Sequence, residues 1–279
     1  MNVDGTSYDQ GLYGSLCESM RKCIFKVLSV GPIPVHVAFI MDGNRRYAMK
    51  HRLSEGDGHK AGFMNLCHIL RHCYDMGVKY VTVYAFSIDN FKRRPEEVQG
   101  LMELMVESIT KLLEAESIVE KYGIRLYFIG NLKLLHKDVR ETAEKAMKVT
   151  ADNKRVVLLV CVAYTSWDEM ANSMDKSCEE KLDEVRKGGG IQGNGEVIPR
   201  GVRVEDIERN MYMSVAPEPD VMIRTSGETR LSNFLLWQTG KTALHCPRAL
   251  WPDLGLWDVV WGVVNYQRSY SYLRDQLHK

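Results

Sequence analysis

The chain of 279 residues is long enough to bury a full hydrophobic core, and its 45% hydrophobic and 26% charged residues are typical of a soluble globular protein. A formal net charge of +1 excludes the global basic field of many nucleic-acid-binding proteins, so an anion must be bound by a local cluster. Seven cysteines without a CxxC pair argue against a disulfide framework or a zinc site, and neither a signal peptide nor a membrane-spanning apolar run is recognisable.

Residues 11–29 predict an amphipathic helix, because apolar side chains recur along one face and basic residues lie among them. Two interpretations are equally open. The helix packs on its own domain, or it rests on a membrane surface or covers an apolar opening. A Gly-Pro turn at 31–34 ends it, so we assign residues 1–33 to an N-terminal helical segment and residues 34–279 to one domain.

The most informative stretch follows an apolar run at residues 36–41, which predicts a buried strand. A turn signal and two arginines that open a predicted helix come next, and in chain order they are Asp42, Gly43, Asn44, Arg45 and Arg46. Helix N-termini and arginines favour phosphate, and a neighbouring carboxylate can hold Mg²⁺ together with phosphate oxygens. The stretch predicts a magnesium-diphosphate site, although a charged loop with a capping aspartate explains it equally well on its own.

The next elements are a helix at 58–76, ended by Gly77, and a strand at 78–86. A polar and basic run at 87–94 follows that strand. Pro95 then begins a long predicted helix at 96–122. This helix is rich in leucine and methionine, so it can line an apolar cavity as well as meet the sheet, but core packing alone also accounts for its composition.

The rest of the chain continues to alternate between strands and helices. Strands are predicted at 124–130, 156–163, 220–223 and 242–246. Helices are predicted at 132–153 and 257–273, and a further helix is predicted to begin after Ser166, its expected N-cap. A charged, glycine-rich stretch at 181–200 is expected to be a mobile surface insertion. The alternation predicts a single α/β domain with a mainly parallel central sheet flanked by helices.

A second polar cluster follows the strand at 220–223. Arg224 and Arg230 flank a Ser-Gly turn, and Ser232 opens a predicted helix at 234–238. Two guanidiniums, a hydroxyl and helix N-terminal amides suit a diphosphate, whereas arginines that bridge Glu228 and other surface acids are the structural alternative. Because the carboxyl ends of parallel strands meet at one edge of a sheet, the clusters at 42–46, 87–94 and 224–232 are expected to converge, and this favours a phosphate site.

Motifs of several other enzyme classes are absent, among them GxxxxGK[ST], a strand-linked GxGxxG, G-x-S-x-G, HExxH and the DDxxD runs of trans-type prenyl synthases. The sequence instead resembles the cis-prenyltransferases of the undecaprenyl diphosphate synthase family, from about residue 34 to 268. The motifs that carry the resemblance are FIMDGNRRYA at 39–48, GHKAG at 58–62, YAFSIDNF at 84–91, RTSGETRLSNFLLWQ at 224–238 and LWPD at 250–253. The resemblance implies a fold with a hydrophobic tunnel and the sequential condensation of isopentenyl diphosphate onto an allylic diphosphate, with each new double bond cis.

The resemblance also implies a role for each matching residue. Asp42 would bind Mg²⁺, the expected cofactor, and help position isopentenyl diphosphate. The residues expected at the reacting centre are His59, Ser87, Asn90 and Phe91, with Asn90 near the proton that is lost. The residues expected to hold the allylic diphosphate or shape its site are Gly43, Asn44, Arg45, Arg46, Arg93 and Glu97. Those expected to bind isopentenyl diphosphate are Arg224, Arg230 and Ser232.

Three departures from bacterial members resemble the eukaryotic dolichol- and rubber-type catalytic subunits. Glu55 replaces a phosphate-binding arginine, Ala243 replaces a glutamate that binds Mg²⁺, and the run AYTSW at 163–167 replaces an NYGGR-type run. Such subunits pair with a Nogo-B-receptor-like accessory subunit, whereas self-sufficient members carry an R-x-G motif in the C-terminal tail. Residues 270–279 hold no such motif, so the resemblance implies a partner that supplies it.

We therefore expect the catalytic subunit of a heteromeric cis-prenyltransferase, peripheral on the cytoplasmic face of the endoplasmic reticulum or in the cytosol, that makes long-chain cis-polyprenyl diphosphates from a farnesyl or geranylgeranyl diphosphate primer. A self-sufficient homodimer is the alternative within this class. A non-catalytic partner subunit is the alternative from another class, and the retention of Asp42, Arg224 and Arg230 disfavours it. The sequence leaves open the product length and whether the N-terminal helix contacts membrane.

Overall fold

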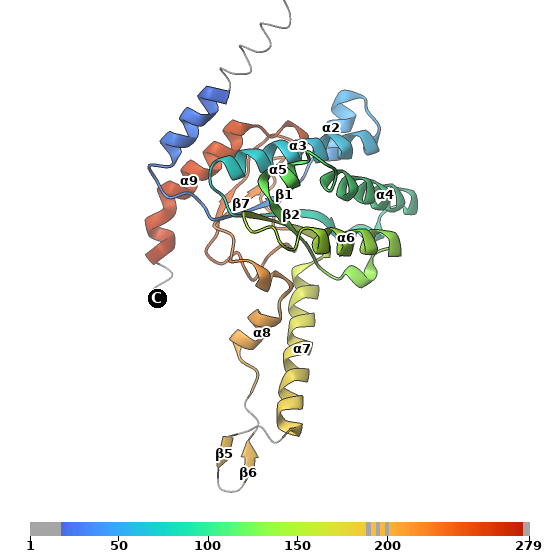
Figure 1. Ribbon diagram of the computed structural model, residues 1–279, viewed down its shortest axis with the longest axis vertical. Coiled ribbons are helices and arrows are strands. Elements are labelled where there is room, and N and C mark those ends of the chain that lie inside the picture. Colours follow the sequence, from blue (N-terminus) through green and yellow to red (C-terminus); the bar gives the residue numbers. More distant parts are fainter. Residues whose placement is uncertain (1–17, 188–190, 194–195, 199–200, 276–279) are drawn as a thin grey trace, which may run out of the picture.

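Six apolar runs of the sequence form one central sheet in the computed structural model, which describes residues 18–187, 191–193, 196–198 and 201–275 (Figure 1). The strands are His36–Ile40 (β1), Tyr80–Ser87 (β2), Ile124–Ile129 (β3), Val156–Tyr164 (β4), Val221–Arg224 (β7) and Ala243–His245 (β8). They lie in the order β3-β4-β2-β1-β7-β8, and every neighbouring pair is parallel. The predicted α/β domain with a parallel central sheet is confirmed.

Most helices lie on one face of this sheet. They are Asn44–His51 (α2), Glu55–Asp75 (α3), Pro95–Leu112 (α4), Ile118–Tyr122 (α5), Lys137–Val149 (α6) and Leu256–Asp275 (α9). Short 3₁₀ helices follow β2 at Ile88–Lys92 (η1) and lie at Leu132–Leu134 (η2), Tyr212–Val215 (η3) and Trp251–Asp253 (η4). Ser166–Arg186 (α7) and Val204–Asn210 (α8) extend away from the opposite side of the sheet (Figure 1).

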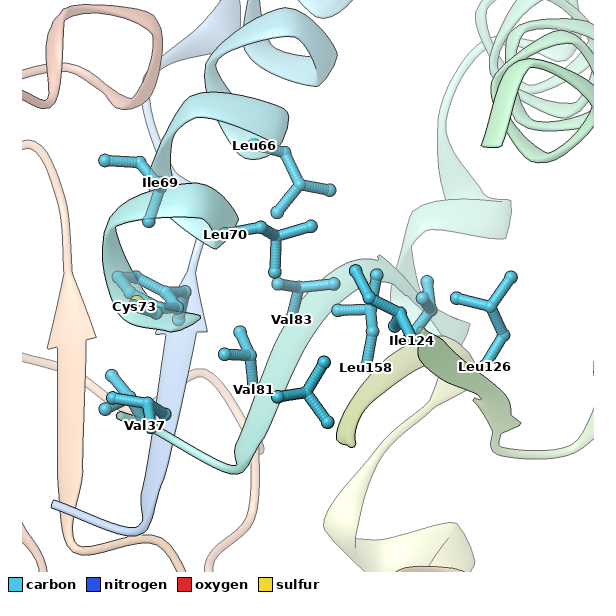
Figure 2. Packing of buried hydrophobic residues seen from close by; sticks show 14 of the residues in the cluster. Val37, Leu66, Ile69, Leu70, Cys73, Val81, Val83, Ile124, Leu126 and Leu158 are labelled. Carbon is cyan, nitrogen blue, oxygen red and sulfur yellow. The ribbon is translucent and has the colours of Figure 1, made fainter. Parts of the chain in front are cut away.

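The alternation of side chains along the strands divides the buried residues into two cores. Val37, Val81 and Val83 face α3, where they pack with Leu66 and Leu70 in the larger core (Figure 2). The intervening residues of β1 point to the other face and join a smaller core, whose members from other segments include Tyr164, Met213, Met222, Phe234 and Leu235. Strands buried on both faces hold their ends rigidly, which fixes the positions of the loops that follow them.

The N-terminal helix packs on its own domain over its described part, residues 18–28. Phe25 and Leu28 are buried in the larger core, and Gln267 Nε2 on α9 donates to the Leu28 carbonyl oxygen at 2.8 Å. Of the apolar face predicted in this part, Leu28 is buried and Ile24 packs against the core, but Met20 is 55% exposed. Arg21, expected on the polar side, is buried and paired with Asp75. The predicted residues 11–17 lie outside the described part of the chain.

Two predicted long helices are wrong, because each is divided into two shorter elements. The helix expected at 96–122 ends at Leu112, and α5 begins at Ile118. Ser117 Oγ donates to the Leu112 carbonyl and accepts from the Glu120 amide, so it closes one helix and caps the next. The helix expected at 132–153 is likewise divided into η2 and α6.

Three further expectations need correction on the opposite side of the sheet. The N-cap of α7 is Thr165, whose Oγ1 accepts from the Asp168 amide, and not Ser166, which is the first helical residue. The expected helix at 234–238 is a series of turns. Residues 181–186 of the expected insertion belong to α7, and Lys187 follows them. Ile191–Gly193 (β5) and Glu196–Ile198 (β6) then form an antiparallel hairpin. The other residues of the insertion lie outside the described part of the chain.

Candidate active site

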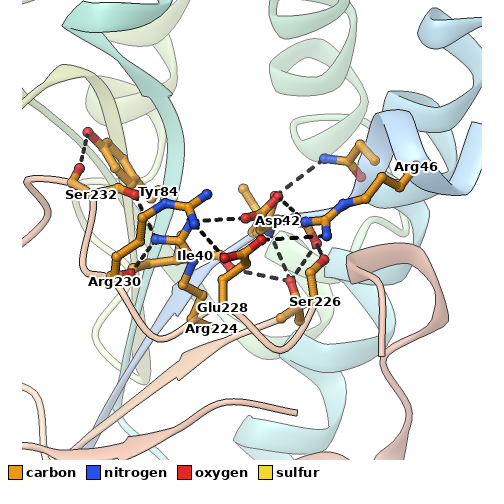
Figure 3. Close-up of polar contacts among 12 residues, drawn as sticks. Ile40, Asp42, Arg46, Tyr84, Arg224, Ser226, Glu228, Arg230 and Ser232 are labelled. Atoms are coloured by element: carbon orange, nitrogen blue, oxygen red, sulfur yellow. Dashed lines mark hydrogen bonds and ion pairs between the residues drawn. The ribbon is translucent and has the colours of Figure 1, made fainter. Parts of the chain in front are cut away.

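Three loops meet at the carboxyl ends of the adjacent strands β2, β1 and β7, and Figure 3 shows the contacts between the loops after β1 and β7. Asp42 lies just after β1, η1 follows β2, and Arg224 is the last residue of β7. These are the three polar clusters that the sequence analysis expected to converge, and they line one polar pocket of about 600 Å³. The predicted site residues on its wall are Asp42, Asn44, Arg45, His59, Ser87, Asn90, Arg93, Arg224, Arg230 and Ser232.

The other four predicted residues do not line the pocket, but each contacts or adjoins a residue that does. Glu97 accepts from Arg93 Nη1 at 2.9 Å and lies 3.7 Å from Arg45 Nη1. Phe91 packs edge-on against Phe86, a residue of the pocket wall. Arg46 reaches Asp42, and Gly43 forms the turn before α2. All of the predicted residues therefore belong to one region, but not all of them line the pocket.

Gly43 is required by the geometry of that turn. Its φ of 112° is a left-handed conformation that favours glycine. A Cβ at this position would lie 2.5 Å from Ser226 Oγ, which is on the loop after β7. The glycine thus allows the loops after β1 and β7 to approach each other closely.

Asp42 is the electrostatic centre of the site. Arg224 Nη2 donates to its Oδ2 at 2.9 Å, and Arg46 Nη2 donates to its Oδ1 at 3.0 Å (Figure 3). Burial acts to raise the pKa of Asp42, but the hydrogen bonds from Arg224 and Arg46 outweigh it, so the pKa is below its ordinary value. The carboxylate is consequently ionised at neutral pH, as a metal ligand must be.

The backbone of Asp42 is held by residues that the sequence analysis did not single out. Thr225 Oγ1 accepts from the Asp42 amide at 2.9 Å. The Asp42 carbonyl accepts from the hydroxyl groups of Thr225 and Ser226 and from the Trp251 amide. Thr225 and Ser226 lie inside the RTSGE motif and Trp251 in LWPD, so the motifs contained these residues, but only the fold shows that they position Asp42.

Arg224 connects Asp42 to the second part of the site. It is only 5% exposed, and its Nη1 donates to Ser232 Oγ at 2.7 Å and also to the Arg230 carbonyl. Arg230 pairs with Glu228, which in turn lies 3.7 Å from Arg46 Nη1. The predicted alternative of an arginine pair bridging acids is therefore observed as well, and it occurs inside the pocket region rather than on a remote surface.

His59 and Asn44 lie where the polar pocket meets an apolar cavity. Burial lowers the pKa of His59 below its ordinary value, and the positive charge of Arg93 lowers it further, so the imidazole is neutral at pH 7. His59 Nε2 and Asn44 Oδ1 are buried and have no hydrogen-bond partner among the described residues. Two unpartnered polar atoms beside a pocket are available to a ligand.

Ser87 and Asn90 form a capping box at the start of η1. Ser87 Oγ accepts from the Asp89 amide at 3.1 Å, and Asn90 Oδ1 accepts from the Ser87 amide at 3.0 Å. These contacts fix both side chains on the pocket wall. Two of the four residues expected at the reacting centre are thus held by local hydrogen bonds.

The apolar cavity has a volume of about 130 Å³ and lies between the sheet and α4. It shares wall residues with the polar pocket, namely Met41, Asn44, His59, Ala85, Phe86 and Leu101. Its inner wall includes Leu104, Met105, Ile109 and Leu112 from α4. The expectation that this helix lines an apolar cavity is confirmed for its 95–112 part.

Two of the departures from the bacterial pattern lie outside the polar pocket. Ala243 begins β8, beyond β7, and is not among the wall residues. Glu55 is 3.7 Å from Arg94 in a neighbouring groove. Within the described residues, no group of three His, Cys, Asp or Glu side chains could hold a metal ion. The carboxylates that line the polar pocket are those of Asp42 and Asp89.

Comparison with known proteins places the chain in a family. Residues 40–272 match the family described as undecaprenyl diphosphate synthase. The chain belongs to this cis-prenyltransferase family. The predicted resemblance is therefore confirmed, and the match spans all three loops of the polar pocket.

Three relatives illustrate the range of this cis-prenyltransferase family. Dehydrodolichyl diphosphate synthase 6 of Arabidopsis thaliana is 57% identical over 262 residues, with 91% of this chain and 89% of that protein covered. Rubber cis-polyprenyltransferase HRT2 of Hevea brasiliensis is 50% identical over 264 residues, with 91% of each protein covered. The dehydrodolichyl diphosphate synthase complex subunit of Homo sapiens is 38% identical over 248 residues, which cover 89% of this chain and 71% of the human protein.

A solved structure agrees with the fold of this cis-prenyltransferase. Lavandulyl diphosphate synthase from Lavandula x intermedia, in complex with dimethylallyl diphosphate, superimposes with a TM-score of 0.71 at 26% identity. The match covers 84% of this chain and 95% of that chain. No helix among the described residues is long and apolar enough to cross a membrane.

Proposed function

We propose that this cis-prenyltransferase adds isopentenyl diphosphate repeatedly to an allylic diphosphate, such as farnesyl or geranylgeranyl diphosphate, and releases a long-chain cis-polyprenyl diphosphate of the dolichol or rubber type. The observation that carries the proposal is that a polar pocket with four arginines on its wall adjoins an apolar cavity, with which it shares wall residues. A substrate with a diphosphate head and a hydrocarbon tail needs this combination of surfaces. Relatives named as dehydrodolichyl diphosphate synthase and rubber cis-polyprenyltransferase support it.

The charges of the pocket suit the ionisation of an allylic diphosphate. When the carbon–oxygen bond breaks, the diphosphate leaves with additional negative charge, and nearby cations stabilise it. Arg45 and Arg93, on the α2 and η1 side, would hold the allylic diphosphate. Arg224, Arg230 and Ser232, on the β7 side, would hold isopentenyl diphosphate. His59, Ser87 and Asn90 line the same pocket.

Mg²⁺ fits this donor set in one specific way. Mg²⁺ is usually bound by one or two carboxylates together with substrate phosphates and water, and Asp42 is an ionised carboxylate on the pocket wall. Asp42 would therefore hold the ion jointly with the substrate, and the bound ion would neutralise phosphate charge. Titration of activity against Mg²⁺ after treatment with a chelator tests this part of the proposal. Full activity without a divalent ion would contradict it.

We also propose that the chain works as the catalytic subunit of a heteromer with a Nogo-B-receptor-like accessory subunit that supplies an R-x-G motif. The human relative is named as a complex subunit, which supports a partner. Trp167 at the start of α7 is 70% exposed, and Leu236, on the segment beside it, is 40% exposed. Such apolar exposure next to the pocket region is expected at an interface.

Peripheral association with the cytoplasmic face of the endoplasmic reticulum, or residence in the cytosol, completes the proposal. Val27 and Val30, on and just after the N-terminal helix, are 67% and 90% exposed, which suits contact with a lipid surface. Flotation of the protein with vesicles, compared with a Val27→Asp, Val30→Asp variant, tests this contact. Equal flotation of both proteins would remove its support.

The central experiment measures incorporation of labelled isopentenyl diphosphate by the purified chain, with and without the accessory subunit, followed by chromatography of the products. We expect little activity from the chain alone and a series of long cis products from the complex. Full activity of the chain alone would favour the homodimeric alternative. The absence of incorporation under both conditions would favour the non-catalytic alternative and overturn the proposal.

A further inference from the structure

The segment after Arg230 has an unusual backbone. Ser232, Asn233 and Leu235 have φ values of 49°, 57° and 47°. None of them is glycine, and residues with side chains rarely adopt this left-handed conformation unless their surroundings impose it. Strained backbone of this kind often occurs at functional sites. Contacts from a neighbouring element hold the segment in this conformation.

The first turn of α7 supplies these contacts. The Ser166 amide donates to the Asn233 carbonyl at 2.8 Å, and Ser166 Oγ donates to the same carbonyl at 3.2 Å. Ser166 Oγ also accepts from the Leu236 amide at 2.9 Å. The Trp167 amide donates to Asn233 Oδ1 at 3.2 Å. Ser166 is fully buried, so water does not replace these bonds.

A second contact holds the far end of the segment to the same turn of α7. Gln238 Nε2 donates to Glu169 Oε2 at 3.0 Å, and both side chains are buried. Tyr164 OH donates to the same oxygen at 2.5 Å. Between the two ends, the Phe234 ring stacks on Tyr84 with centroids 4.4 Å apart. The segment therefore has little freedom to shift relative to α7.

The held segment carries part of the pocket. Ser232 and Asn233 both line it, and Ser232 Oγ accepts from Arg224 Nη1 at 2.7 Å. Ser232 is joined directly to Asn233, so a change in the Asn233 carbonyl position moves the Ser232 hydroxyl. It also disturbs Arg224, whose other nitrogen reaches Asp42.

We propose that Ser166 is a positioning residue for the isopentenyl diphosphate side of the site, and that it acts through Asn233 on Ser232 and Arg224. This inference rests on the proposed function, because that function assigns the β7 side of the pocket to isopentenyl diphosphate. Ser166 does not line the pocket itself. Because its contacts reach the pocket through Asn233 and Ser232, its effect is expected to be specific for the substrate bound on the β7 side.

The test compares Ser166→Ala with a matched control on the same helix. Ser177 is also fully buried on α7, and its hydroxyl donates to the Ser173 and Asp206 carbonyls, away from the pocket. Steady-state kinetics of the assembly that incorporates isopentenyl diphosphate are measured with this substrate and farnesyl diphosphate varied separately. We expect Ser166→Ala to raise KM for isopentenyl diphosphate about tenfold, because it leaves the buried Leu236 amide without its acceptor, and to change KM for farnesyl diphosphate less than about twofold.

Two further variants keep the test decisive. Ser177→Ala should lower the melting temperature to a similar extent but leave both KM values unchanged within about twofold. Ser166→Cys retains the approximate size of the side chain and a weak hydrogen-bonding group, so it should fold even where Ser166→Ala does not. It should raise KM for isopentenyl diphosphate by less than the alanine variant and again leave KM for farnesyl diphosphate unchanged.

The possible results separate this inference from the proposed function. A parallel rise of both KM values in the Ser166 variants, or the same substrate-specific rise in Ser177→Ala, would overturn the positioning role. Unchanged KM values in folded Ser166 variants would overturn it as well. Failure of the wild-type assembly to incorporate isopentenyl diphosphate would instead overturn the proposed function.

Discussion

The polar groups at the two ends of the strands β2, β1 and β7 differ in how completely the protein itself satisfies their hydrogen bonds. At the amino end, Asp220 accepts from the Val35 and His36 amides at 2.6 and 3.0 Å. His36 is fully buried, with Nδ1 at 2.6 Å from the Pro217 carbonyl and Nε2 at 2.7 Å from Thr82 Oγ1. A carbonyl only accepts, so Nδ1 carries the hydrogen and Nε2 of the neutral ring accepts from Thr82. Each of these groups is satisfied within the protein.

At the carboxyl end, several polar groups of the pocket region remain exposed or without a hydrogen-bond partner among the described residues. The side chains of Arg46 and Arg230 are 46% and 63% exposed although both pair with acids. His59 Nε2 and Asn44 Oδ1 have no partner among the residues that the structure describes. The same three strands therefore use polar groups for stability at one end and, under the proposed function, for ligand binding at the other.

The largest expected effect is the loss of turnover at the carboxyl end. Asp42→Asn keeps the shape of the side chain and an oxygen that accepts from Arg224, but it removes the charge. We expect incorporation of isopentenyl diphosphate to fall by about a thousandfold, as for loss of a group that stabilises transition-state charge. Arg224, which is 5% exposed, loses its carboxylate partner, so the free energy of unfolding, measured by urea denaturation, should also fall by about 1–3 kcal/mol, and turnover is compared at a temperature at which both proteins are folded. Near-normal turnover would remove Asp42 from the chemistry.

The matching change at the amino end should affect stability alone. His36→Ala leaves the Thr82 hydroxyl and the Pro217 carbonyl unpaired and creates a cavity, so we expect the free energy of unfolding to fall by about 2–4 kcal/mol. Thr82→Val breaks only the bond to Nε2 and should cost about 1–2 kcal/mol. Both folded variants should keep kcat within about twofold of wild type at a permissive temperature. A large loss of kcat in either variant would blur the distinction between the two ends.

The amino end should also make stability depend on pH. Burial lowers the pKa of His36 from 6.5 to about 4, outweighing the backbone hydrogen bonds that raise it. Between these values the unfolded chain binds a proton that the folded chain does not, so stability is full above pH 6.5 and is lost as the pH falls toward 4. His36 alone should remove about 3 kcal/mol over this window.

The variant His36→Gln separates the contribution of His36 to the pH dependence from that of other histidines. Burial and the charges of Arg21 and Arg71 lower the pKa of His72 to about 4 as well, so it titrates in the same window. The difference between wild type and His36→Gln, measured by urea denaturation from pH 7 to 4, therefore reports His36. An identical pH dependence in both proteins would show that His36 is not buried as a neutral ring.

The smallest expected effect is a shift in the titration of His59 at the carboxyl end. NMR should place the midpoint of His59 below 6.5, because burial and then Arg93 lower its pKa. Arg93→Gln removes the cation and should raise this midpoint. Arg94→Gln, which changes a 73% exposed side chain paired with Glu55, is the control and should shift it less. Equal shifts in both variants would argue against the placement of Arg93 beside His59.

The carboxyl ends of the strands could be predicted from the sequence better than the amino ends. Strands such as β1, β4 and β7 were predictable because their apolar runs are buried on both faces, and the clusters after the strands could be placed because parallel strands align their carboxyl ends. The amino-end network was not predictable, because His36 meets Thr82 and Pro217 through pairings distant in the sequence. The turns at 234–238 were mistaken for a helix because their conformation depends on Ser166, which lies about seventy residues earlier.

The ion pairs of the pocket region bear on how many condensations one enzyme can perform. Among the described residues, Arg45, Arg46, Arg93, Arg224 and Arg230 share only three carboxylates, those of Asp42, Glu97 and Glu228. A diphosphate that binds these guanidiniums competes with the acids, and the acids recover the guanidiniums when it departs. Under the proposed function, each cycle of chain growth ends with such an exchange, so the acids would keep the by-product from becoming an inhibitor.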